Sequence, residues 1–131
     1  MPEIAASGLW TSANDLSQLV LALMKSYRGE SDFLPQAIAA DMMTRVDNSW
    51  HGLGPRLNGE GETRVFHHGG ANNSYRAHME GHLGTNSGIV LLTNGTRGGE
   101  LYLEVHQSAA EAFDWPVSRT AGSYAAPDFV E

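Results

Sequence analysis

The sequence predicts an α+β fold, in which a small antiparallel sheet is packed with helices. Apolar residues recur at helical spacing near the start and near the end of the chain. Between them, three β-prone segments follow one another and are separated by turn-rich links. The order helix, helix, three strands, helix is typical of an α+β domain rather than of alternating strands and helices. We therefore expect a meander of three or four antiparallel strands.

The first helix is predicted over residues 13–28. Ser12 followed by an acid at Asp15 has the spacing of a capping box at a helix start. The apolar residues that recur behind it at helical spacing are Leu16, Leu19, Val20, Leu23, Met24 and Tyr27. Gly29 is expected to end this helix.

A second helix is predicted to begin within 32–35, where Pro35 suits the first helical turn. Its expected apolar stripe consists of Ile38, Met42 and Val46. The glycine-rich stretch that follows leaves room for at most one short strand, near 50–57.

Three strands are predicted next, over 63–68, 74–82 and 88–94, linked by turns at "GGANN" and "LGTNS". The second strand alternates: Tyr75, Ala77 and Met79 share one face, and Arg76, His78, Glu80 and His82 share the other. The third is nearly all apolar, as a strand covered on both faces should be. A last helix is predicted over 100–113, ended by Trp115-Pro116.

Composition limits the function classes. The chain has 131 residues, the size of one domain, with 15 acidic against 8 basic residues and a net charge of −7. This charge argues against nucleic-acid binding, which needs a basic face. The absence of cysteine excludes disulfides and thiolate chemistry. Neither a signal peptide nor a membrane-spanning run is recognisable, so we expect a soluble chain that is cytoplasmic as given. No cofactor is expected.

Four of the six histidines lie within "FHHGGANNSYRAHMEGH", residues 66–82. Imidazoles from paired strands can form a zinc-like site, so His67, His78 and His82 are candidate metal ligands. Residues four apart on a strand are separated by about 13 Å, however, so His78 and His82 are not expected to share one ion unless the strand bends. The competing interpretation is a polar strand face that points to solvent.

Motifs for nucleophilic catalysis are missing from the sequence. No serine lies in G-x-S-x-G, and the one lysine, Lys25, has Ala22 where S-x-x-K requires serine. No tyrosine is followed two positions later by asparagine. The residues alone therefore identify no catalytic centre.

The stretch "HHGGANNSYRAHMEGHLGTNSGIVLLTNG" nevertheless resembles the third-motif region of serine β-lactamases and penicillin-binding proteins, most of all class C β-lactamases and their esterase relatives. His68-Gly69-Gly70 matches a His-x-Gly motif, and Leu92-Thr93-Asn94 matches the end of the following apolar strand. Upstream, "SGLWTSANDL" and "HGLGPRL" are similar to a helix start and a strand of that family.

The resemblance implies that residues 1–116 are the C-terminal portion of a serine hydrolase acting on β-lactams, peptides or esters, followed by an irregular tail, 117–131. Without its nucleophile half, the chain is expected to be inactive alone, and Ser74 is the candidate nucleophile if it is active. The alternative is an oligomeric module that binds a metal or small ligand through the hairpin 67–82. A long apolar edge at 88–94 also predicts a homodimer, or a complementing N-terminal chain, paired along it.

Overall fold

The computed structural model describes residue 5 and residues 8–115, and it confirms the α+β class. The four strands form one antiparallel sheet in the order β1-β2-β3-β4. The elements of the described chain are α2 (Ala13–Tyr27), α3 (Gln36–Met42), β1 (Arg56–Asn58), the 3-10 helix η1 (Gly61–Thr63), β2 (Val65–Ala71), β3 (Arg76–His82), β4 (Ser87–Thr93) and α4 (Gly98–Ala112).

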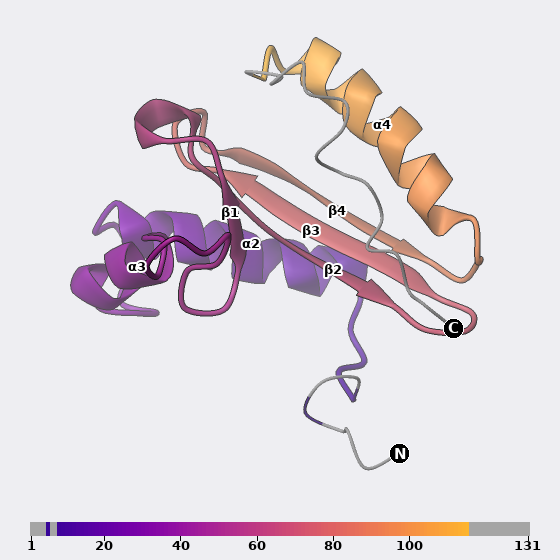
Figure 1. Cartoon of the computed structure of the whole chain (residues 1–131), viewed down its shortest axis with the longest axis horizontal. Helices are drawn as coiled ribbons and strands as arrows, with labels where there is room; N and C mark the ends of the chain where they lie inside the picture. Colours follow the sequence, from indigo (N-terminus) through magenta and orange to yellow (C-terminus); the bar gives the residue numbers. More distant parts are fainter. Residues whose placement is uncertain (1–4, 6–7, 116–131) are drawn as a thin grey trace.

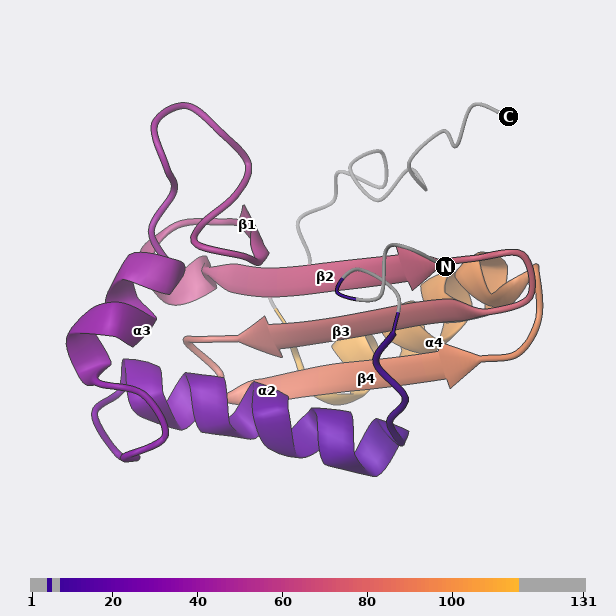
Figure 2. The ribbon, with the colours of Figure 1, turned by 90° about the horizontal axis from the view of Figure 1, so that it is seen from below.

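The molecule has three layers, with the sheet in the middle (Figure 1). Helix α2 lies against one face of the sheet, with α3 packed beside it, and α4 lies against the other face. Figure 2, seen from the side of α2, shows this helix running along β4, at the edge of the sheet. The two faces of the sheet are therefore covered by helices from opposite ends of the chain.

Helix α2 begins and ends where the sequence predicts. The Ser12 hydroxyl accepts a hydrogen bond from the backbone N–H of Asp15 at 3.1 Å and donates one to its carboxylate at 2.7 Å. Such a cap satisfies a backbone donor that has no partner within the helix. Gly29 follows the helix with φ of 74°, a left-handed conformation that glycine adopts without strain.

Helix α3 is shorter than predicted and ends at Met42. Val46 lies beyond it, where its backbone N–H donates to the carbonyl of His51 at 2.9 Å, so Val46 does not extend the apolar stripe. Ile38 is 48% exposed, and Ala39 is the residue of this helix that is buried. The helix ends before Val46 because the loop after it forms its own backbone hydrogen bonds.

Strands β2 and β3 form a longer hairpin than predicted. The segment Gly69–Ala71, which the sequence suggested as part of a turn, continues β2 and pairs with β3 through Gly70–Ala77 and Ala71–Arg76. The turn itself is confined to the four residues between the strands, where the Asn72 side chain accepts hydrogen bonds from the N–H groups of Ser74 and Tyr75. A local side-chain acceptor is typical of asparagine in turns.

The hydrophobic core lies on the α2 face of the sheet. Its buried residues are Val20, Leu23, Met24, Met43, Leu57, Phe66 and Leu83. The ring of Phe66 occupies the space where Gly81 on the neighbouring strand would carry a side chain, so this face is closely packed. Among the described residues, no helix is long and apolar enough to cross a membrane. The predicted tail, 117–131, lies outside the described residues.

Candidate metal centre

The polar face of β3 is buried, contrary to the expectation that it points to solvent. The predicted alternation is correct, but the face that carries His78, Glu80 and His82 lies under α4 (Figure 1). Glu80 is 0% exposed and His82 is 6% exposed. The sequence pattern of the strand gives the alternation but not the helix that covers it.

The carboxylate of Glu80 is the centre of a hydrogen-bond cluster that joins β3 to α4. Its Oε1 lies 2.6 Å from His82 Nε2 and 3.0 Å from His106 Nε2. Its Oε2 accepts a hydrogen bond from the Tyr102 hydroxyl at 2.9 Å and lies 3.2 Å from His78 Nε2. All four neighbours can act as donors, so both oxygens of this buried carboxylate are satisfied.

These contacts determine which ring nitrogens carry protons. An ionised carboxylate only accepts hydrogen bonds, so the Nε2 of His78, His82 and His106 must each be protonated to bond Glu80. In a neutral imidazole, Nδ1 is then the acceptor. The Nδ1 of His82 is buried without a hydrogen-bond partner in the described part of the chain. This nitrogen is free to take the proton if a cation displaces it from Nε2.

Burial alone would raise the pKa of Glu80, but hydrogen bonds from His106, His78 and His82 outweigh it and hold the pKa well below its ordinary value. The carboxyl group of Glu80 is therefore ionised at neutral pH. Nearby His67 behaves differently: burial, reinforced by the adjacent His78, lowers its pKa to about 4. His67 is thus neutral at neutral pH, and its imidazole can act as a hydrogen-bond acceptor or a metal ligand.

Aromatic rings cover much of the cluster, although the side chains of His78 and His106 remain 13% and 17% exposed. The His78 ring lies 4.0 Å from that of Tyr102, and the His82 ring stacks on Trp115 at 4.1 Å. Trp115 is 4% exposed, and its indole N–H donates to the hydroxyl of Ser87 at 2.6 Å. The low polarity of this shell strengthens the electrostatic interactions inside it.

Glu80, His82 and His106 form a set of metal-ligand type. Each offers one ligand atom, and these atoms all lie within 4.8 Å of one another. With zinc–ligand bonds of about 2.0–2.2 Å, the ligands of a tetrahedral ion lie about 3.3 Å apart. The two oxygen–nitrogen distances of 2.6 and 3.0 Å are somewhat shorter, so an ion that replaced the protons would need small outward shifts of the side chains.

The three histidines proposed from sequence as metal ligands, His67, His78 and His82, lie close together, but their contacts with Glu80 differ. His82 belongs to the three-residue set, and His78 contacts the other oxygen of the same carboxylate. His67 stacks on His78 with ring centroids 5.8 Å apart, and its Nε2 lies 3.2 Å from the amide nitrogen of Asn58. His78 and His82 need not bind one ion together, because each contacts a different oxygen of Glu80, which lies between them on the strand.

The other residues singled out from sequence lie away from this cluster. His68, Gly69 and Gly70 are exposed on β2, and His68 has the opposite strand orientation to His67. Ser74 is exposed in the turn before β3.

Sequence reasoning missed Glu80 and His106 as site residues. Glu80 was placed on the same strand face as His78 and His82 but was not considered as a ligand. His106 follows Tyr102 by four residues, so the two share one face of α4. A polar strand face together with a polar pair at helical spacing is the signal that could have identified both.

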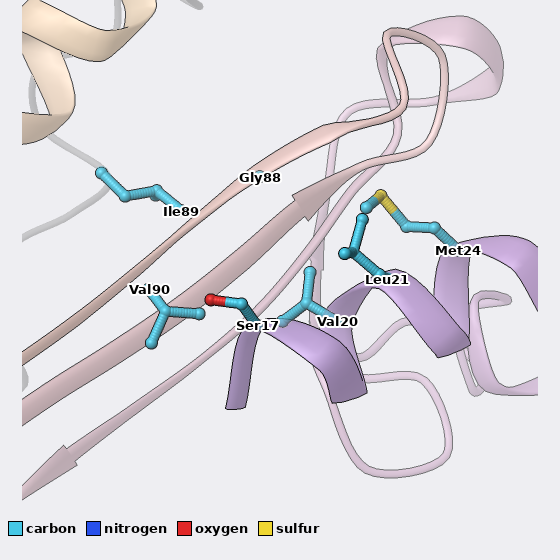
Figure 3. Close-up of a pocket in the computed structure, with 7 residues that line it drawn as sticks. All are labelled: Ser17, Val20, Leu21, Met24, Gly88, Ile89 and Val90. Atoms are coloured by element: carbon cyan, nitrogen blue, oxygen red, sulfur yellow. The ribbon is translucent and has the colours of Figure 1, made fainter. Parts of the chain in front are cut away.

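A separate apolar pocket of about 140 Å³ lies on the other side of the sheet, between α2 and β4 (Figure 3). Ser17, Val20, Leu21 and Met24 line it from α2, and Gly88 and Val90 line it from β4. Figure 3 shows Ile89 pointing away from α2. The pocket offers one hydroxyl and no charged group, so it has no metal-binding chemistry. The homodimer or complementing chain expected at the neighbouring edge of β4 stays a prediction.

Comparison with solved structures identifies the fold. A crystal structure of SurE matches with a TM-score of 0.67 and 23% identity, over 77% of this chain and 25% of that chain. A crystal structure of SurE with D-Leu matches with the same TM-score and 24% identity, over 77% of this chain and 26% of that one. The chain thus spans about a quarter of the length of these SurE chains. No family model and no curated protein matches it.

These comparisons correct the assignment made from sequence motifs. Both of these matching structures are of SurE, and no family model assigns the chain to serine β-lactamases or penicillin-binding proteins. The interpretation as an inactive portion of a β-lactamase-like serine hydrolase is therefore withdrawn. The match of His68, Gly69 and Gly70 to a His-x-Gly motif depended on that resemblance. Short motifs such as His-x-Gly are too common to carry a family assignment.

Proposed function

We propose that this chain binds a divalent transition-metal ion through Glu80, His82 and His106. The proximity of one carboxylate and two imidazoles, with ligand atoms within 4.8 Å, is the observation that carries the proposal. Imidazole and carboxylate ligands suit zinc and its neighbours in the first transition row better than calcium or magnesium. Among the abundant transition-metal ions, zinc is the one that this ligand set favours.

The surroundings of the three ligands support the same conclusion. The negative charge of Glu80 is buried, and a divalent cation would compensate it directly. His78 and Tyr102 hold the second carboxylate oxygen and fix the direction of the first. Such contacts to a ligand carboxylate commonly raise metal affinity 10- to 100-fold, so we expect the variant His78→Ala to weaken binding by about that factor.

Calorimetric titration of the full chain with zinc chloride, after treatment with a chelator, tests the proposal. We expect one ion per chain and a loss of more than about 100-fold in affinity in His82→Ala and His106→Ala. His51→Ala and His68→Ala are matched controls because both side chains are exposed, and their affinity should be unchanged. The absence of binding in the parent chain, or binding that survives in the double variant of His82 and His106, would refute the site.

Tryptophan fluorescence provides an independent reading of where the ion binds. Trp115 stacks on His82, whereas Trp10 and Trp50 are 87% and 67% exposed. In a chain carrying Trp10→Phe and Trp50→Phe, the remaining emission comes from Trp115. Cobalt or nickel should quench this emission at one equivalent, because these ions quench a nearby indole. Quenching that appears only at large excess would indicate weak surface chelation instead.

A further inference from the structure

We infer that the bound metal ion acts as a clamp that holds α4 on the sheet, so that the metal controls whether this helix is docked. The inference rests on the proposed function, because it uses the same ion at the same site. It concerns the regulation of the fold by that ion. Two features of α4 carry it: how the helix contacts the sheet, and how the ligands are divided between the two elements.

Helix α4 contributes no residue to the main hydrophobic cluster on the α2 face, and its own buried apolar residues are Tyr102 and Ala110. Three of its large apolar side chains are exposed: Leu101, Leu103 and Phe113, which follows the last residue of the helix, are 47%, 51% and 67% exposed. The side chains that face the sheet include Tyr102 and His106, which both bond Glu80. The docking of α4 therefore depends on a polar cluster to an extent that the docking of α2 does not.

The three ligands lie on two elements that meet only through tertiary structure. Glu80 and His82 belong to β3, and His106 belongs to α4, 24 positions beyond His82 in the sequence. An ion bound by all three joins the helix to the strand. An ion that binds only the docked state lowers the population of the undocked state. The factor is about the free ion concentration divided by the dissociation constant, so it is about 100-fold when that concentration is 100 times the dissociation constant.

The opening should be largest in the second half of α4. At its start, Gly98 is buried against Thr93 and Arg76 so closely that a side chain would not fit there. This contact does not depend on the metal. Beyond it, the helix is attached through the Glu80 cluster and, just after its end, through Trp115, which stacks on the metal ligand His82. We therefore expect residues 103–112 to gain most from the ion.

Hydrogen–deuterium exchange of the full chain tests the clamp, with zinc at 100 times its dissociation constant or with a chelator. In the chelator we expect amides of α4 to be less protected than those of α2, because the helix opens without global unfolding. Zinc should slow exchange in α4 by about 100-fold and close this gap. His106→Ala should keep α4 weakly protected in zinc, whereas His51→Ala should behave as the parent chain.

Three results would overturn the clamp or its basis, and they are distinguishable. Zinc binding by calorimetry without any change in α4 exchange would refute the clamp and leave the proposed function standing. Equal protection of α4 and α2 in the chelator would also refute it, because α4 would then have no opening of its own. The absence of zinc binding would remove both proposals together.

Discussion

The two faces of the sheet are stabilised by different physics, although the same strands supply both. On the α2 side, Phe66 packs into a closed apolar core. On the α4 side, the next residue of β2, His67, lies opposite Glu80 in the polar cluster. Apolar burial is non-directional and nearly independent of pH, whereas a buried polar cluster depends on every partner being present. The stability that the apolar face contributes is thus nearly independent of pH, whereas the polar face responds to its chemical environment.

The largest effect is expected on the apolar face. Phe66→Ala should lower the free energy of unfolding by about 3–5 kcal/mol, because it leaves a cavity beside Gly81 and Leu57. Urea denaturation at neutral pH, with and without zinc, measures the change, and the loss should be the same in both. Phe33→Ala is the matched control: Phe33 is 54% exposed, so its removal should cost well under about 1 kcal/mol. Equal losses for the two variants would contradict the placement of the core.

On the polar face, Glu80→Gln should lower the free energy of unfolding by about 2–3 kcal/mol. The amide keeps the shape but presents an NH2 group to donors that require an acceptor. The same change at Glu104, which is exposed on α4, alters the net charge equally and should be nearly neutral. Thermal melting of both variants measures the difference. If Glu80→Gln raises the free energy of unfolding instead, the cluster destabilises the fold and serves function rather than stability.

Two adjacent glycines at the start of α4 provide a finer test of how closely this helix is docked. A side chain at Gly98 would collide with Thr93, whereas one at Gly99 would meet nothing within 4 Å. Gly98→Ala should therefore destabilise the fold by about 1–3 kcal/mol through overpacking. Gly99→Ala should stabilise it by about 0.5–1 kcal/mol, because alanine is the better helix former. Chemical denaturation of the pair separates the two effects, and a cost at Gly99 would mean that α4 starts elsewhere.

A contrast between local patterns and tertiary contacts explains which elements could be predicted from the sequence. The apolar spacing of α2 and the alternation of β3 are local patterns, and both predicted their elements correctly. The extension of β2 through Gly69–Ala71 depends on its pairing with β3, so a turn-like composition was misleading there. Local patterns determine elements, but strand pairing determines where they end.

The site was less predictable because it is assembled from both sides of an interface. The histidines of β3 were visible as candidates, but their face was expected to be solvated. Whether α4 covers that face is a property of the tertiary fold, and His106 becomes meaningful only once the helix is in place. A lone histidine on a helix does not indicate which residue of a distant strand it will contact.

The smallest expected effect is a dependence of stability on pH, which comes from the polar face and does not involve the apolar core. The pKa of His67 is lowered to about 4 in the folded chain, against an ordinary value of 6.5. Between these values the unfolded chain binds a proton that the folded chain does not, so stability is full above pH 6.5 and falls as the pH drops towards 4. The lowered pKa of Glu80 contributes in the same direction only below the ordinary carboxyl range.

We therefore expect the chain to lose about 1 kcal/mol between pH 7.5 and 5 through His67 alone, after allowance for its partial exposure. Urea denaturation of the parent chain and of His67→Gln at both pH values isolates this contribution, because glutamine does not titrate. Phe66→Leu should shift both values equally and leave the pH dependence intact, since it affects only the apolar face. If His67→Gln shows the same pH dependence as the parent chain, His67 is not the residue that makes the α4 face sensitive to pH. The histidines that contact Glu80 would then be the next to substitute.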